Sequence, residues 1–381
     1  MELVLNQEQE LLAGTAREFF AAQCPVSALR LLRDSQDPVG FDPSVWLRMA
    51  ELGWTAIPFP ESVGGLNCGI RSLGVLFEEA GRTLAACPLI SSLVLGGLAI
   101  VLTGSAEQLR HYAPGVIAGD ILLALVVGDE VQNESASVAL LATPSGAGYV
   151  LNGDSSFVID GHVANYFVVA AGTAGCRDEN SGITLFIVDA DAPGIDRQRI
   201  HIIDSRNAAH VRFDNVYVSP EAVLGEPDAG AGCLEEVLDC GRACISAEML
   251  GIGQNMFDKT IAYLKDRFQF GVPIGSFQAL QHRAARMFTE LELTRSAVVA
   301  ALDAVDSRSK DRRAIVSLAK WKVGTVLDLI SREAVQMHGG IAMTDEMDIG
   351  LYLKRGRVLR NTFGGEDFHQ ERYAALIGLG L

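Results

Sequence analysis

The sequence lacks the short motifs that identify several common enzyme classes. It contains no GxGxxG and no GxxxxGK[ST] pattern, so neither a Rossmann dinucleotide site nor a phosphate-binding P-loop is indicated. The HExxH pair of zinc proteases and the GxSxG turn of serine hydrolases are also absent. The acidic run Asp189–Gly194 lacks the remaining ligands of a calcium loop and follows a strand-like segment. We therefore expect a turn there and no metal site in the chain.

Disulfide, signal-peptide and membrane-spanning patterns are equally absent. The seven cysteines are scattered, odd in number and never spaced as CxxC, which indicates free thiols in a reducing compartment. Residues 1–14 carry acids among leucines and no basic segment of the kind that begins a signal peptide. The apolar stretch Leu89–Leu102 is too short to cross a membrane and contains Gly96 and Gly97. We expect a cytoplasmic protein with no membrane partner.

Basic residues are outnumbered by acidic ones. The 381-residue chain has 31 Lys and Arg against 47 Asp and Glu, which gives a formal net charge of -16. Such a surface repels phosphate backbones, so nucleic acid is excluded as a partner. An anionic ligand would need local basic residues. Because 49% of the residues are hydrophobic, the chain can bury a sizeable core and is long enough for two or three domains.

The residue pattern changes twice along the chain. The first region has apolar residues at helical spacing, the second has short β-branched or aromatic runs separated by turn residues, and the third has long stretches without proline. The clearest long stretches are Arg242–Lys265 and Ala284–Val305. The strand-like runs are Val138–Thr143, Tyr149–Asn152, Phe167–Ala171, Ile183–Val188 and Val211–Val218. This pattern predicts an α+β protein with an N-terminal α-helical domain (1–114), a middle antiparallel β-sandwich or barrel domain (115–228) and a C-terminal helical bundle (229–381).

The segment Arg267–Gln281 combines residues that suit a phosphate-bearing cofactor. Arg267 stands at the end of one predicted helix, where a cation could meet a pyrophosphate, and Phe270 offers an aromatic face. Gln278 lies near the start of the next helix, where free backbone N–H groups favour anions. The alternative is an ordinary corner between two helices with exposed polar residues, and the chemistry alone favours it.

Two Gly-Gly pairs follow in the last region. In Gln336–Gly340, Gly339 and Gly340 would let the backbone approach a ligand closely, and Gln336 is placed to hydrogen-bond a cofactor. A glycine that ends a helix would explain Gly339 equally well. The second pair lies in Phe363–Glu366 and is weak as a signal by itself.

Four segments together resemble the acyl-CoA dehydrogenase family over almost the whole chain. They are Leu52–Gly65, Phe213–Glu226, Arg267–Gln281 and Gln336–Gly340, in the family's order. The resemblance implies the acyl-CoA dehydrogenase fold with a C-terminal four-helix bundle, and FAD bound between the β domain and the bundle. It also implies a tetramer in which a neighbouring subunit touches FAD. The residues that would make those contacts are Arg267, Phe270, Gln278, Gln336, Gly339 and Gly340.

The family's reaction is α,β-dehydrogenation of an acyl-CoA thioester, in which a glutamate removes a proton from Cα while a hydride leaves Cβ for flavin N5. The two positions at which members carry this glutamate align here with Gly364 and Gly241. Glu248 is the first candidate replacement. It lies on the same predicted helix as Gly241, seven residues further along, about two turns or roughly 10 Å away. The alternative for Glu248 is a buried carboxylate paired with an arginine.

Three further side chains near Gly364 could serve as bases, namely Glu366, Asp367 and His369, although a solvated turn and a surface histidine explain them more simply. In the flavin-contacting strand Phe157–Asp160, Ile159 stands where the family has a threonine hydroxyl.

The resemblance leaves two forms of the enzyme open. One is the base-lacking partner in a heterotetramer with a second acyl-CoA dehydrogenase subunit. The other is a homotetramer that uses Glu248. Both would act on an acyl-CoA in lipid or steroid side-chain breakdown and pass electrons to an electron-transferring flavoprotein. The alternatives are a non-catalytic scaffold and a flavin oxidase or monooxygenase.

Overall fold

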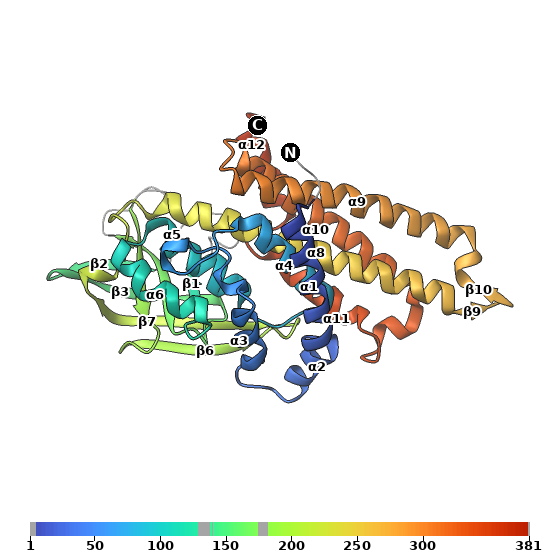
Figure 1. The fold of residues 1–381 in the computed structure, drawn as a ribbon, viewed down its shortest axis with the longest axis horizontal. Coiled ribbons are helices and arrows are strands. Elements are labelled where there is room, and N and C mark those ends of the chain that lie inside the picture. Colours follow the sequence, from blue (N-terminus) through green and yellow to red (C-terminus); the bar gives the residue numbers. More distant parts are fainter. Residues whose placement is uncertain (1–4, 129–137, 139, 174–181, 380–381) are drawn as a thin grey trace. The chain divides into compact units, whose positions relative to one another are not determined.

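The computed structural model describes residues 5–128, 138, 140–173 and 182–379 (Figure 1). It divides into two compact units. Unit 1 contains Met1–Asp34, Ile70–Ala85 and Arg242–Leu381, and unit 2 contains Ser35–Gly69 and Ala86–Gly241. The domain limits after residues 114 and 228 stay a prediction.

Unit 2 combines short helices with a sheet. Its helices include α3 (Pro43–Glu51), α5 (Leu98–Thr103) and α6 (Ala106–Ala118), and Leu89–Gly97 forms a π-helical segment. Helix α6 begins where Ser105 accepts a hydrogen bond from the backbone N–H of Gln108 while the Gln108 side chain returns one to Ser105, and it ends at Gly119 with φ 82°.

Among the described residues, eight strands form one sheet in the order β6-β7-β3-β2-β4-β5-β8, and β1 pairs with β4. The strands are β1 (Leu123–Val126), β2 (Leu141–Ser145), β3 (Gly148–Ile159), β4 (Tyr166–Thr173), β5 (Ile183–Asp189), β6 (Ile195–His201), β7 (Asn207–Val218) and β8 (Val223–Leu224). The buried face carries Phe167, Phe186 and Phe213, which form part of one apolar cluster.

The predicted strands are found, with differences. Four of the runs fall within β3, β4, β5 and β7, and β2 takes up the end of the fifth, of which residue 139 lies outside the described residues. Most neighbours are antiparallel as predicted, but β1 and β2 both pair with β4 in parallel. Residue alternation carries no information on strand direction, so this mixed sheet could not be foreseen. The predicted turn after β5 is confirmed, since the Asp189 carboxylate accepts a hydrogen bond from the N–H of Asp191.

Unit 1 is helical. It contains α1 (Gln7–Gln23), α2 (Val26–Asp34), α4 (Gly69–Thr83), the part of α8 (Gly230–Asp266) from Arg242 onward, α9 (Gln278–Asp306), α10 (Arg312–His338), α11 (Ile349–Asn361) and α12 (Glu366–Leu376). The strands β9 (Phe268–Gln269) and β10 (Val272–Pro273) form a short hairpin between α8 and α9 (Figure 1). None of the described helices is both long and apolar enough to span a membrane.

Helices α4 and α8 cross at two glycines. A methyl group on Gly81 would overlap the backbone carbonyl of Glu248, and one on Gly251 would overlap the carbonyl of Glu78. The two backbones are therefore in direct contact, which only glycine permits. Beside this crossing, the Tyr352 hydroxyl donates a hydrogen bond to the Arg82 carbonyl at 2.5 Å. This bond connects α11 to the end of α4.

Candidate active site

Glu248 is buried, as its apolar neighbours in the sequence predict. Its Oε1 accepts a hydrogen bond from Nε of Arg355 on α11 at 2.9 Å and forms an ion pair with Nη2 of the same residue at 2.9 Å, and the Glu248 and Arg355 side chains are 6% and 8% exposed. This is the alternative stated for Glu248, a structural carboxylate paired with an arginine. To accept a substrate proton the carboxylate would have to leave its partner, and breaking such a buried pair costs about 3–5 kcal/mol. The catalytic role of Glu248 stays a prediction.

The turn at Gly364, which the resemblance aligns with the usual base position, has an unusual backbone. Phe363 and Gly364 both have positive φ, 59° and 110°. A Cβ on Gly364 would overlap the Phe368 ring and lie 3.0 Å from Nε2 of His369. A residue with a side chain therefore meets both backbone strain and a steric clash at this position. Gly241, at the other family position, is buried on α8.

Two buried cations hold this turn through its carbonyl groups. Lys320 on α10 donates from Nζ to the carbonyl oxygens of Leu359 at 2.9 Å, Arg360 at 3.0 Å and Gly364 at 3.3 Å. Arg242 on α8 donates from Nε to the Phe363 carbonyl at 3.1 Å. The sequence reasoning did not identify Lys320, because a lysine in an amphipathic helix ordinarily points to solvent.

The other acids near the turn have different environments. Glu366 accepts from Nε of Arg360 at 3.0 Å and makes a second, shorter contact with Nη2 of the same residue, while Arg360 also donates to Asp328 on α10 at 2.7 Å. Asp367 is exposed, as predicted.

His369 is not the surface histidine that the sequence suggested. It is 1% exposed because α12 packs it against α10, with Nδ1 at 3.4 Å from the Ser317 hydroxyl. Burial, together with the positive charges of Lys320, Arg242 and Arg372, lowers the pKa of His369 to about 2. The imidazole is therefore neutral and enclosed at neutral pH.

The six predicted cofactor contacts gather at one end of unit 1. Arg267 ends α8, Gln278 begins α9, and Gln336 lies in the last turns of α10. An ion pair between Arg283 and Glu333 joins the start of α9 to the end of α10. The Tyr263 and His338 rings stack at 4.5 Å and join α8 to α10.

All six of these residues face solvent in the single chain. Phe270 is 90% exposed and has φ 55° at the tip of the β9–β10 hairpin. Gly339 ends α10 with φ 68°, as the alternative for it proposed. No protein atom lies within 4 Å of a Cβ placed on Gly339 or on Gly340, so a ligand could approach the backbone there.

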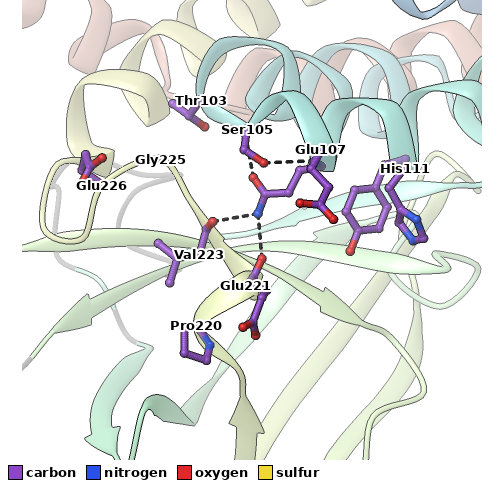
Figure 2. Close-up of a pocket in the computed structure, with 11 residues that line it drawn as sticks. Thr103, Ser105, Glu107, His111, Pro220, Glu221, Val223, Gly225 and Glu226 are labelled. Carbon is purple, nitrogen blue, oxygen red and sulfur yellow. Dashed lines mark hydrogen bonds between the residues drawn. The ribbon is translucent and has the colours of Figure 1, made fainter.

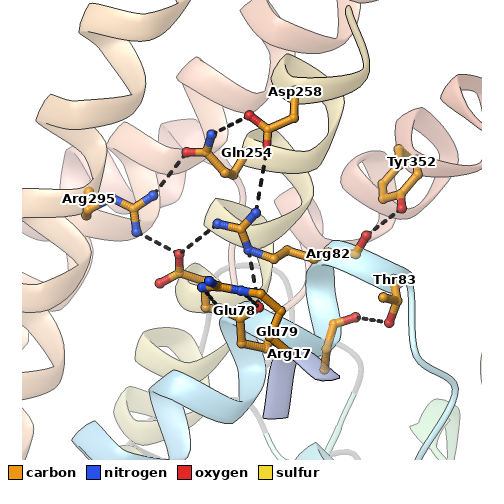
Figure 3. Close-up of polar contacts among 10 residues, drawn as sticks. Arg17, Glu78, Glu79, Arg82, Thr83, Gln254, Asp258, Arg295 and Tyr352 are labelled. Atoms are coloured by element: carbon orange, nitrogen blue, oxygen red, sulfur yellow. Dashed lines mark hydrogen bonds and ion pairs between the residues drawn. The ribbon is translucent and has the colours of Figure 1, made fainter. Parts of the chain in front are cut away.

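A charged network lies beside the α4–α8 crossing (Figure 3). Arg17 and Arg82 both contact Glu79, with N–O distances of 2.7 Å and 3.4 Å, and Arg295 contacts Glu78 at 2.6 Å. Together with Arg71, these residues form the polar side of a cavity of about 330 Å³, whose apolar side comes from Val75, Leu250, Val298 and Leu302 among others. Each arginine contacts a carboxylate, but the partner of Arg71 is Asp303, outside the lining, so arginines outnumber carboxylates in the wall of the cavity.

A larger cavity of about 590 Å³ lies in unit 2 between α6 and the segment that leads into β8 (Figure 2). Gln108 spans one side of it and donates from Nε2 to the carbonyls of Glu221 at 2.9 Å and Val223 at 2.8 Å. Its lining includes the carboxylates of Glu107, Glu221 and Glu226. An acidic lining repels phosphate, so this cavity does not suit coenzyme A or a dinucleotide.

An N-terminal and a C-terminal segment of the chain match known family models. The model described as "Acyl-CoA dehydrogenase, N-terminal domain" matches residues 6–120, and "Acyl-CoA dehydrogenase, C-terminal domain" matches residues 228–377. The chain belongs to the acyl-CoA dehydrogenase family. It is 28% identical over 352 residues to acyl-CoA dehydrogenase IpdE2 of Mycolicibacterium smegmatis, covering 92% of this chain and 93% of that protein.

Solved acyl-CoA dehydrogenase structures have the same fold. A variant of the Tcur3481-Tcur3483 steroid ACAD is 31% identical with a TM-score of 0.86, over 98% of both chains. The ChsE4-ChsE5 complex from Mycobacterium tuberculosis is 22% identical with a TM-score of 0.89, over 99% of both chains, and shows the fold alone. The predicted family and fold are confirmed.

Acyl-CoA dehydrogenases are FAD-dependent oxidoreductases, and the residues at the exposed end of unit 1 fit such a cofactor. Arg267 supplies a guanidinium, which pairs well with phosphate oxygens. Helix α9 starts without a side-chain cap, so its first N–H groups beside Gln278 are available to an anion. The exposed Phe270 ring and the open backbone at Gly339 and Gly340 suit a flat ring and a close backbone contact.

Proposed function

We propose that this chain is the base-lacking subunit of a heterotetrameric acyl-CoA dehydrogenase. The observation that carries the proposal is the turn at Gly364, which has no carboxylate and no room for one. Glu248, the first candidate replacement, is paired with Arg355. A second subunit of the same fold would supply the glutamate that removes the α-proton.

In this proposal the chain contributes cofactor contacts to the assembly. Arg267, Gln278 and the N-terminus of α9 would hold the pyrophosphate, and Phe270, Gln336, Gly339 and Gly340 would line the rest of the dinucleotide. When bound, FAD accepts the hydride that leaves Cβ of the acyl group. An electron-transferring flavoprotein would then receive the electrons.

The substrate we propose is an acyl-CoA thioester from lipid or steroid side-chain breakdown. Support comes from the 31% identical relative, which is named a steroid ACAD and is composed of two named components. The similar fold of the two-component ChsE4-ChsE5 complex agrees with a heteromeric arrangement.

The main alternative is a homotetramer in which Glu248 is the base. It requires Glu248 to separate from Arg355 when substrate binds. A scaffold without flavin and an air-oxidised flavin oxidase or monooxygenase are further alternatives. A purified protein without visible flavin bands would favour the scaffold, and reoxidation by air rather than by an electron-transferring flavoprotein would favour the oxidase or monooxygenase.

The deciding experiment is an anaerobic titration of the purified holoprotein with a panel of acyl-CoAs, followed by the visible flavin bands. We expect no bleaching by the chain alone and bleaching after co-expression with a second acyl-CoA dehydrogenase subunit. Glu248→Gln should leave the co-expressed enzyme's bleaching intact, as should the control Glu292→Gln on the exposed side of α9. Bleaching by the chain alone that disappears in Glu248→Gln would establish the homomeric alternative instead.

A further inference from the structure

The buried lysine behind the Gly364 turn has no role in the function proposed above. Lys320 is 2% exposed, and an ammonium group so far from water needs compensation for its lost hydration. Here the compensation comes from backbone oxygens, since the Leu359 and Arg360 carbonyls at the end of α11 and the Gly364 carbonyl in the turn that follows accept its three N–H bonds. Few other arrangements would satisfy an ammonium group completely without a carboxylate.

The same turn is strained in a way that requires support. Two successive residues have positive φ, and one of them, Phe363, is not glycine and has its side chain buried. A left-handed conformation is unfavourable for a residue with a Cβ and persists only where the surroundings fix it. Lys320 and Arg242 together bind the carbonyls of Leu359, Arg360, Phe363 and Gly364.

A second set of contacts closes the turn from the other side. Arg360 bridges Asp328 on α10 and Glu366 at the first position of α12. The Arg242 guanidinium lies 5.6 Å from the centre of the Phe368 ring, the ring that fills the space a side chain on Gly364 would need. Helices α8, α10, α11 and α12 thus all contribute a side chain to one short turn.

We propose that Lys320 is a positioning residue, whose hydrogen bonds to the 359–364 carbonyls fix the Gly364 turn in the form that excludes a side-chain base. The consequence of this role rests on the proposed function, in which the fixed turn without a base would face the acyl group. Because the surrounding helices fix the turn, a carboxylate introduced at position 364 would not restore a working base.

The test compares Lys320→Met with Lys322→Met in the holoprotein. Lys322 lies on the same helix and pairs with Glu290 at 2.6 Å, away from the turn, so it is a matched control for loss of a lysine from α10. Hydrogen–deuterium exchange should show protection of residues 359–368 reduced at least tenfold in Lys320→Met and unchanged in Lys322→Met. Lys320→Gln, which keeps two N–H donors without the charge, should be intermediate and serves if the Met variant does not fold.

A readout of function accompanies the exchange measurement. In the co-expressed enzyme, Lys320→Met should raise the acyl-CoA concentration needed to perturb the flavin spectrum, while the FAD content stays that of the wild type. Unchanged protection of residues 359–368 in both Lys320 variants would overturn the positioning role. The exchange measurement needs neither turnover nor a partner subunit. It can therefore contradict the positioning role of Lys320 while the proposed subunit assignment stands. Conversely, the exchange result can be interpreted even if no partner subunit is found.

Discussion

Gly364 is the residue on which the proposed absence of a base depends most directly. Its φ of 110° lies in the region that side chains rarely adopt, and the Phe368 ring occupies the place of a Cβ. A substitution must therefore either distort the turn or displace a ring that packs against Arg242. The packing of the turn therefore requires a glycine at this position.

Gly364→Ala should lower the unfolding free energy by about 2–6 kcal/mol, since backbone strain and overpacking each cost about 1–3 kcal/mol. Chemical denaturation would measure this. The control is Gly232→Ala on α8, where no atom lies within 4 Å of an added Cβ and φ is ordinary, so the change should be neutral or slightly stabilising. Equal stabilities of the two variants would contradict the tight turn.

Lys320 should make stability depend on pH. Burial lowers the pKa of Lys320 to about 7 from an ordinary value of 10.5, with Arg242 and Arg360 adding to the shift and Glu366 opposing it. His369, the other titratable neighbour, stays neutral because its pKa is lowered to about 2. Between about pH 7 and pH 10.5 the unfolded chain thus binds the extra proton, and the unfolding free energy should rise with pH.

The slope expected from this one group is at most about 1.4 kcal/mol per pH unit. Denaturation of the wild type and of Lys320→Met between about pH 7 and pH 10.5 would isolate the contribution of Lys320. The Lys320→Met protein should lose this contribution to the rise of the unfolding free energy with pH, while Lys322→Met should keep it. Above pH 7 a neutral amine can donate only two of the three hydrogen bonds, so the turn should also loosen as the protein becomes more stable. A Lys320→Met curve parallel to the wild type would contradict this titration.

At the scale of the elements, helices α4 and α8 cross in unit 1 with their backbones in direct contact. Gly251 places the α8 backbone against the carbonyl of Glu78, and Gly81 does the same for α4 against Glu248. This contact brings Glu78, Glu79 and Arg82 to the network shown in Figure 3. It also fixes the part of α8 that carries Glu248.

Gly251→Ala should destabilise the protein by at least about 2 kcal/mol, because a methyl group would overlap a backbone carbonyl that cannot rotate away. Gly253→Ala is the matched control two residues along the same helix, where the nearest side-chain atoms lie at 3.4 Å. It should be near neutral, since alanine favours the helix and has room. Thermal denaturation would compare the stabilities of the two variants. Similar melting temperatures would contradict the direct backbone contact at Gly251.

The elements also indicate what the sequence can and cannot predict. The long helices and five strands follow from period and composition, because Arg242–Lys265 and Ile183–Val188 carry strong local signals. Strand β6 was missed because Ile195–His201 is mostly polar and half exposed. Glu248 and Arg355 are 107 positions apart, and Lys320 is 39–44 positions from the carbonyls that it binds. No local pattern in the sequence could reveal contacts over such separations. Glu248 was recognised only as an acid in an apolar run.

At the scale of the whole molecule, the exposed β9–β10 hairpin is the surface through which we expect the proposed assembly to form. Phe268 and Phe270 are 61% and 90% exposed, and Val272 and Phe277 beside them are partly exposed. The Phe270 and Phe277 rings are in contact, and exposed apolar side chains gathered in this way favour an interaction site. With a net charge of -16, acidic chains repel one another, so in the proposed assembly apolar contacts would have to supply the attraction.

The double variant Phe268→Ser/Phe270→Ser should therefore lose both assembly and FAD. Light scattering after size exclusion should give a smaller mass than the wild type, and the visible flavin absorbance per chain should fall with it, because Arg267 and Phe270 are proposed to complete a neighbour's cofactor site. The control Leu11→Ser/Leu31→Ser removes two leucines that are 73% and 70% exposed on α1 and α2, and should change neither quantity. Salt should strengthen wild-type assembly by screening the negative charges. If the Phe268→Ser/Phe270→Ser variant keeps the wild-type mass and flavin content, the hairpin is needed for neither assembly nor cofactor binding.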